Sequence, residues 1–171
     1  MAALGYVIGG ARGAGDKLLA AVAERLGAEG WPLAGVVQIN TDRASGADCD
    51  MDLRVLGRSE RIRISQNLGS GSRGCRLDPE GLQTAVGLVE TTMTPVPRLL
   101  IVNKFGKAEI EGSGFRALIG EALAQDVPVL LGLKPLNLPG FEDFAQGLAE
   151  ALPGDLETVL DWCRAQAAAE I

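Results

Sequence analysis

A glycine-rich loop near the N-terminus constrains the fold of this chain more than any other stretch of its sequence. The apolar run 4–8 ends in a loop that contains Gly9, Gly10, Gly13 and Gly15, and an alanine- and leucine-rich helical pattern follows that loop. A strand, a glycine-rich turn and a helix N-terminus in that order are typical of a phosphate-binding loop. Its backbone N–H groups and the positive end of its helix dipole face an anion. This order predicts an α/β fold with an anion site at one edge of its sheet.

The loop departs from the usual chemistry of such sites. In the standard spacing G-x-x-x-x-G-K-[ST] the glycines are Gly10 and Gly15, so Asp16 stands at the lysine position and Lys17 at the hydroxyl position. One step along a helix turns a side chain by about 100°, so we do not expect Lys17 to reach a phosphate as the standard lysine does. The Asp16 carboxylate would repel a phosphate, and Arg12 is the cation inside the loop that could replace the lysine.

Two interpretations of this loop remain open from the sequence. In one, it is only a tight turn in which Asp16 caps its own helix. In the other, it binds an anion or nucleotide through the following residues: Gly10, Arg12, Gly13, Ala14, Gly15, Asp16 and Lys17.

A second candidate segment begins where another buried strand, 99–102, ends. In nucleotide hydrolases this position offers an acid that holds magnesium and polarises water. Here Asn103 and Lys104 occupy it, and Lys104 is the opposite of a catalytic base. We therefore expect Arg12, Lys104 and Lys107 to converge on an anion without a metal ion.

The acidic residues that follow have two interpretations. Glu109 and Glu111 could face a cleft from a loop and position a metal ion or a water molecule. They could equally be solvated charges ahead of a helix. Of the two, Glu109 is included with Asn103, Lys104 and Lys107 among the candidate binding residues.

Strand and helix patterns alternate along the rest of the chain. Short apolar runs predict strands at 4–8, 33–39, 99–102 and 127–131. Apolar stripes at helical spacing predict helices at 16–28, from 78 to the prolines at 95 and 97, and at 115–124, 141–152 and 156–169. The loops expected at the carboxyl edge of the sheet, where ligands bind in such folds, are 9–15, 38–42, 103–111 and 132–138.

The segment between the second strand and the next helix has a different character. Residues 40–50 are polar and predict a long turn, whereas 51–56 and 61–65 alternate apolar and charged residues and predict a hairpin. A polar, glycine-dense loop is expected at 67–74. The sequence thus predicts one P-loop-like domain over 1–171, a doubly wound α/β fold whose mostly parallel sheet carries a β-hairpin inserted at about 40–66.

Composition excludes several classes of function. A net charge of −6 and a pI of about 4.7 argue against a nucleic-acid partner or an anionic membrane surface. Histidine, the commonest general base and transition-metal ligand, is absent, and the three cysteines form no C-x-x-C pair. No stretch approaches the roughly 18 apolar residues of a membrane span. We expect a cytoplasmic protein with no membrane insertion and no metal site.

Four strings of the sequence resemble a known family. They are Leu-Ala-Gly-Val-Val-Gln at 33–38, Gln-Asn-Leu-Gly at 66–69, Gly-Cys-Arg-Leu-Asp-Pro at 74–79, and Asn-Lys-Phe-Gly-Lys at 103–107 with Glu109, Glu111 and Gly112. Across nearly the whole chain they resemble the bacterial domain of unknown function often encoded beside molybdenum-transport genes. This resemblance implies a role in molybdenum metabolism and a partner protein of the molybdenum system, but no particular reaction.

More distantly, the layout is similar to the small P-loop nucleoside-triphosphatases first described from thermophiles. These have a P-loop, a second strand that runs into a hairpin, and an Asp-Glu-x-Gly-x-x-Glu string after a later strand. Aligned on Gly106, this chain keeps the last glutamate as Glu109, whereas Asn103 and Lys104 stand where the two acids belong. The resemblance implies a nucleotide site whose hydrolytic groups are altered.

The sequence favours a protein that binds ATP, GTP or a related oxyanion, serves molybdenum or tungsten metabolism, and hydrolyses nucleoside triphosphates poorly or not at all. A magnesium cofactor is doubtful, and no residue is assigned a catalytic role. Two alternatives remain open. One is an active nucleoside-triphosphatase with unorthodox residues, and the other is a molybdate- or tungstate-binding sensor or carrier.

Overall fold

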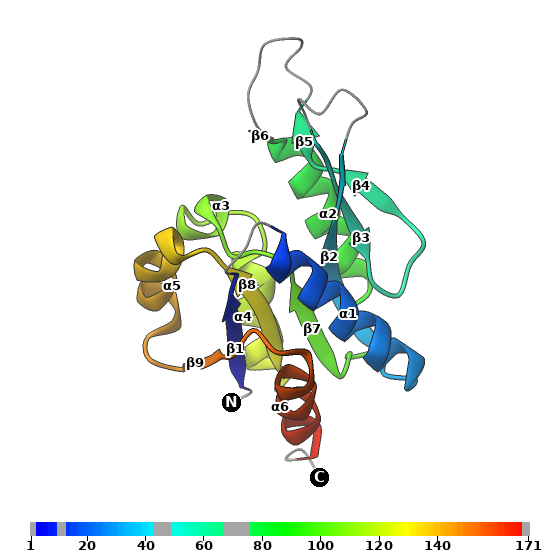
Figure 1. Cartoon of the computed structure of the whole chain (residues 1–171), viewed down its shortest axis with the longest axis vertical. Helices are drawn as coiled ribbons and strands as arrows, with labels where there is room; N and C mark the ends of the chain where they lie inside the picture. Colours follow the sequence, from blue (N-terminus) through cyan, green and yellow to red (C-terminus); the bar gives the residue numbers. More distant parts are fainter. Residues whose placement is uncertain (1–2, 10–12, 43–48, 67–75, 169–171) are drawn as a thin grey trace.

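A seven-stranded mixed sheet forms the centre of the protein in the computed structural model, which describes residues 3–9, 13–42, 49–66 and 76–168 (Figure 1). The strand order is β4-β3-β2-β7-β8-β1-β9. The strands of this sheet are β1 (Leu4–Ile8), β2 (Leu33–Asp42), β3 (Cys49–Val55), β4 (Arg61–Arg63), β7 (Leu99–Val102), β8 (Val129–Leu133) and β9 (Ala149–Leu152). A separate two-stranded sheet pairs β5 (Ser65–Gln66) with β6 (Arg76–Leu77).

Five of these strands pair with one another in parallel, and the other two are joined to them by antiparallel pairing. The strands β2, β7, β8, β1 and β9 pair in parallel, whereas β3 and β4 extend the β2 edge as an antiparallel ribbon. The predicted α/β fold, with its mostly parallel sheet and inserted hairpin, is therefore confirmed. Because the parallel strands share one direction, their carboxyl ends meet at one edge of the sheet.

Helices cover both faces of the sheet. They are α1 (Ala14–Ala28), α2 (Pro79–Thr91), α3 (Lys107–Ile110), α4 (Arg116–Ala124), α5 (Leu138–Ala145) and α6 (Leu156–Ala168), with a short 3₁₀ turn, η1 (Pro135–Asn137). Buried residues of α1 and α6 form one core cluster with one face, and those of α2, α4 and α5 form another with the opposite face. Every residue of β7 and β8 is buried, as expected of parallel strands covered on both sides.

The strongest sequence patterns gave the most accurate boundaries. The strands predicted at 4–8 and 99–102 match β1 and β7, and α1 begins two residues before its predicted start. The predicted start of α2 is confirmed in detail, because the side chain of Asp78 accepts a hydrogen bond from the N–H of Glu80 at 3.1 Å.

The prediction of one helix over 141–152 is wrong in its second half. Helix α5 ends at Ala145, because Gln146 (φ 53°) and Gly147 (φ 80°) adopt left-handed conformations that stop a helix. The chain then forms β9, which pairs in parallel with β1 at the edge of the sheet. Pairing with a neighbouring strand decides the conformation of this segment, and its own apolar pattern does not reveal that.

The predicted turn over 40–50 is also wrong at both of its ends. Strand β2 continues to Asp42 and β3 begins at Cys49, with Asn40 opposite Met51 and Thr41 opposite Asp50. Hairpin pairing here outweighs the polar composition of the segment. Residues 43–48 and the loop predicted at 67–74 lie outside the described residues.

Candidate functional site

The glycine-rich loop lies at the carboxyl edge of the sheet, between β1 and α1. Gly13 precedes α1 in a left-handed conformation, with φ 78°, and makes no side-chain cap. A Cβ on Gly9 would lie 3.6 Å from the backbone nitrogen of Gly15, so the two sides of the loop approach closely. Two of the candidate residues, Gly10 and Arg12, fall outside the described residues.

Asp16 is the centre of a hydrogen-bonded cluster at this edge. Its side chain is buried, and both of its carboxylate oxygens accept short hydrogen bonds from amide groups. The Nδ2 of Asn103 donates to Oδ1 at 2.7 Å, and the Nδ2 of Asn40 donates to Oδ2 at 2.7 Å. The carboxylate is thus directed at the ends of β2 and β7. The N-cap of α1 is Gly13, and no described backbone N–H of α1 donates to Asp16, so the interpretation of Asp16 as the cap of its own helix is wrong.

A second layer of amide groups fixes the first. The Oδ1 of Asn103 accepts a hydrogen bond from the backbone N–H of Gln38 at 2.8 Å. The Nε2 of Gln38 donates to Oδ1 of Asn40 at 2.8 Å. Among the described residues, no buried side-chain nitrogen or oxygen lacks a hydrogen-bond partner. Asp16, Asn103, Gln38 and Asn40 therefore form one satisfied network, whose geometry is set by the register of β2 against β7.

Lysine side chains provide positive charge at the same edge. The Nζ of Lys104 lies 3.7 Å from Oδ1 of Asp16, and the Lys104 side chain is 39% exposed. Burial lowers the pKa of Lys104 below its ordinary value; the carboxylate of Asp16 opposes this shift, and the charge of Lys134 adds to it. Lys104 follows β7 and Lys134 follows the neighbouring strand β8. The two cations thus come from adjacent strand ends.

The structure does not bring all the predicted cations together. Lys107 is 86% exposed and forms its ion pair with Glu111 at 3.9 Å, within α3. Lys17 is exposed on α1, as its displaced position in the motif predicts. Lys104 is thus the predicted lysine that contacts the Asp16 cluster. The sequence marked 38–42 and 132–138 as edge loops but did not single out Gln38, Asn40 or Lys134.

Glu109 has a structural role that neither sequence interpretation anticipated. Its side chain is buried, its Oε1 accepts from the N–H of Gly106 at 2.8 Å, and its Oε2 accepts from the N–H of Phe115 at 3.0 Å. The carboxylate joins the start of α3 to the start of α4, so the interpretation of Glu109 as a solvated charge is wrong. Among the residues described, no group of three or more histidine, cysteine, aspartate or glutamate side chains could hold a metal ion.

The burial of Glu109 gives a pH prediction. Burial raises the pKa of its carboxyl above the ordinary value, and the hydrogen bonds from Gly106 and Phe115 only oppose this. At pH values between the ordinary pKa and the raised one, the folded chain therefore keeps a proton on Glu109 that the unfolded chain has released. The stabilisation from this group is fully present below the ordinary pKa and is lost as the pH rises through the raised one.

We expect the free energy of unfolding of the wild type, relative to Glu109→Gln, to fall as the pH rises from about 4 towards neutrality. Urea unfolding at a series of pH values measures this difference. The glutamine cannot titrate, so its loss of one acceptor adds only a constant offset. A difference that is flat or rises with pH would contradict the assignment.

Comparison of the sequence with known proteins identifies the family of this chain. A family model described as "Protein of unknown function (DUF2478)" matches residues 4–162, and the chain therefore belongs to this family. The "Molybdenum import ATP-binding protein ModC 2" of Bradyrhizobium diazoefficiens is 32% identical over 149 residues. These are 87% of this chain but 17% of that protein, so the chain spans about one sixth of the length of this relative.

A solved structure shares the fold. The crystal structure of THEP1 from the hyperthermophile Aquifex aeolicus superposes with a TM-score of 0.60 over 94% of this chain and 95% of that one. The sequence identity is 15%, so the likeness shows the fold alone. No helix in the described part of the chain has the length and apolar character needed to cross a membrane.

Proposed function

We propose that this member of the DUF2478 family binds the phosphate groups of a nucleotide, or a related oxyanion, at the carboxyl edge of its sheet. The contact between Lys104 and Asp16 at 3.7 Å carries the proposal. A standard site has its lysine on the loop and its acid at the end of a nearby strand. In this chain the acid lies on α1 and the lysine follows β7. The acid and the lysine have thus exchanged places between α1 and the end of β7. The carboxyl edge of the sheet still has a cation, Lys104, near the N-terminus of α1.

The donor set at this edge does not fit a magnesium ion. Magnesium requires near-octahedral coordination by oxygen atoms. Each Asp16 oxygen already accepts an amide hydrogen bond at 2.7 Å, and the amide oxygen of Asn103 accepts the N–H of Gln38. The positive charge of Lys104 stands where hydrolases place an acid. We therefore propose that binding is independent of magnesium and that hydrolysis is weak or absent.

The cellular role that we propose is in molybdenum or tungsten metabolism, in the cytoplasm and beside a protein of the molybdenum system. The printed name of the Bradyrhizobium relative supports this role. Because the match covers 17% of that protein, its import and ATP-binding activities are not transferred as a whole.

A molybdate-binding sensor or carrier is the second candidate. Molybdate is a tetrahedral dianion, and a ring of backbone N–H groups with one or two lysines suits such an ion as well as it suits a phosphate. The absence of a fitting magnesium site around Asp16 favours this candidate, because a free oxyanion needs no metal.

Calorimetry separates these functions. We expect ATP or GTP to bind to the wild-type chain equally well in magnesium and in EDTA, with little phosphate release. Binding of molybdate with no response to either nucleotide would replace the nucleotide proposal with the second candidate. Magnesium-dependent phosphate release that Lys104→Ala abolishes would establish an active hydrolase instead. If none of these ligands binds at millimolar concentration, both binding proposals are wrong.

A further inference from the structure

A cavity lies at the opposite end of the sheet from the candidate site. It has a volume of about 540 Å³ and is lined by the C-terminal half of α1, the start of β2, the turn between β3 and β4, and the segment 92–97. Helix α1 begins beside Asp16 and ends at this cavity, so the two places are separated by the length of the helix. The volume lies within the range of pockets that bind small molecules.

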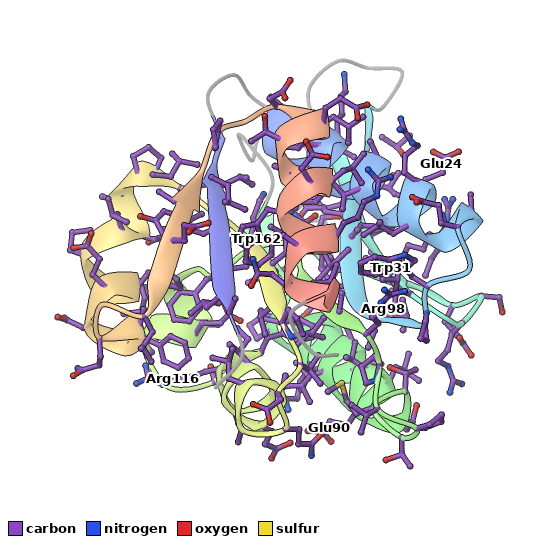
Figure 2. All side chains as sticks on the ribbon, turned by 90° about the horizontal axis from the view of Figure 1, so that it is seen from below. Glu24, Trp31, Glu90, Arg98, Arg116 and Trp162 are labelled. Carbon is purple, nitrogen blue, oxygen red and sulfur yellow. The ribbon has the colours of Figure 1, made fainter. Side chains whose placement is uncertain are left out.

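An aromatic side chain forms one wall of this cavity and is held in place. Trp31 lines the cavity, and the guanidinium carbon of Arg98 lies 4.0 Å from the centre of its ring. Figure 2 shows the two side chains beside each other. The backbone N–H of Arg98 also donates to the carbonyl of Pro32 at 2.8 Å. A wall that is fixed in advance loses little conformational freedom when a ligand packs against it.

An uncompensated positive charge borders the same cavity. Arg54 lines it, and Arg54 lies directly opposite Arg61 in the antiparallel pairing of β3 and β4. Like charges in such a cross-strand pair are destabilising. The structure describes the side chains of several arginines. Among them, Arg54 and Arg61 are the two whose side chains form no ion pair, no hydrogen bond and no contact with an aromatic ring.

The neighbouring arginines show what is unusual about this pair. Arg58 also lines the cavity, but its guanidinium makes two hydrogen bonds to Glu60, at 2.8 and 2.9 Å. Arg63, on the same strand as Arg61, pairs with Asp50 and Asp52. Among the described residues, no carboxylate side chain lines the cavity itself. Arg54 lines this largely apolar, aromatic-walled cavity, and Arg61 adjoins it only as the cross-strand partner of Arg54. An unpaired guanidinium group at the wall of such a cavity is a feature that recognises a small organic anion.

We infer that this cavity binds a small organic anion, with an aromatic or apolar body against Trp31 and its anionic group at Arg54 and Arg61. The inference does not depend on the proposed function, because it uses residues at the other end of the sheet. A suitable probe is 8-anilinonaphthalene-1-sulfonate, an aromatic anion that fluoresces when bound. Its matched neutral probe is N-phenyl-1-naphthylamine, which lacks the sulfonate.

Titration of the folded wild-type chain with the sulfonate is expected to saturate at one site. The double variant Arg54→Ala/Arg61→Ala should weaken the sulfonate about tenfold or more, since hydrogen bonds to charged groups have that magnitude. The neutral probe should be affected much less. As a control, Arg25→Ala removes an exposed arginine from α1 that pairs with Glu157, and it should leave both probes unchanged.

A second variant fills the cavity without a predicted clash. Gly27 lines the cavity, and a Cβ built on it meets no atom within 4 Å. Gly27→Leu should therefore fold, with an unchanged or higher melting temperature, and should weaken both probes. Sulfonate binding that neither variant reduces would overturn the inference. So would non-saturable binding, or loss of sulfonate binding in Lys104→Ala, which would place the probe at the candidate site instead.

Discussion

Replacing Gly35 with alanine is expected to lower the free energy of unfolding by about 4 kcal/mol, measured by urea denaturation. Gly35 lies within β2 at φ 113°, a conformation that side chains rarely adopt. Its added Cβ would stand 1.8 Å from the carbonyl oxygen of Ile101, which is its register partner on β7. The overlap is with backbone on both sides, so the two central strands must separate to relieve it.

The matched control for this change is another glycine-to-alanine variant. Gly27 lies inside α1, where an added Cβ meets nothing within 4 Å. Gly27→Ala should raise the free energy of unfolding by about 0.5 to 1 kcal/mol, because alanine is the better helix former. If Gly35→Ala instead changes stability by less than about 1 kcal/mol, the close approach of β2 to β7 is not as described.

Gly35 also connects the fold to the candidate site. The register that pairs Gly35 with Ile101 brings the N–H of Gln38 to Oδ1 of Asn103 at 2.8 Å. A variant that shifts β2 against β7 should therefore disturb the Asp16 network as well as stability. Anion binding by any surviving folded fraction of Gly35→Ala is expected to be weaker than that of the wild type.

The central fold could be predicted because its signals are local. Strands β1 and β7 are short apolar runs ended by a turn or a polar residue, and Asp78 with Pro79 marks the start of α2. Strand β9 could not be predicted, since its conformation depends on the free edge of β1, which lies far away in sequence. The close approach at Gly35 has no sequence signal beyond the glycine itself.

The candidate site could be predicted only in part, for a similar reason. The motif spacing identified Asp16, Asn103 and Lys104, because each replaces a residue type that a standard site requires. What Asp16 does instead depends on Asn40, which donates to it, and on Gln38, which donates to Asn40; both lie on β2, which pairs with β7. An amide in a strand carries no motif, so only the three-dimensional arrangement reveals these partners.

For Glu109 the motif spacing indicates a binding role, whereas the contacts of its side chain are structural. Its spacing from Gly106 matches a catalytic glutamate string, yet its carboxylate is committed to the N–H groups of Gly106 and Phe115. A Cβ on Gly114 would lie 1.8 Å from its Oε2, so the surrounding loop is closely fitted to this side chain. The same spacing thus serves a structural purpose in this chain.

Lys104→Ala is expected to weaken anion binding by about ten- to a hundredfold, the range for losing one hydrogen bond between charged groups. In the proposed exchange of charges between α1 and the end of β7, Lys104 takes the place of the standard loop lysine. Lys17, the displaced loop lysine, is exposed. Lys17→Ala should therefore cost much less affinity than Lys104→Ala. A larger loss from Lys17→Ala would contradict the exchange, and calorimetry with the same ligand measures both.

Asp16→Asn should change anion affinity in the opposite direction. It removes a carboxylate that lies 3.7 Å from Lys104, so it frees that cation and removes a repulsive charge from the edge. We expect about fivefold tighter binding, together with a loss of about 1 kcal/mol of stability because one amide donor loses its acceptor. If Asp16 held a metal ion, the same change would abolish binding in magnesium and spare it in EDTA. The sign of this one effect therefore decides whether the buried acid opposes the ligand or binds it through a metal.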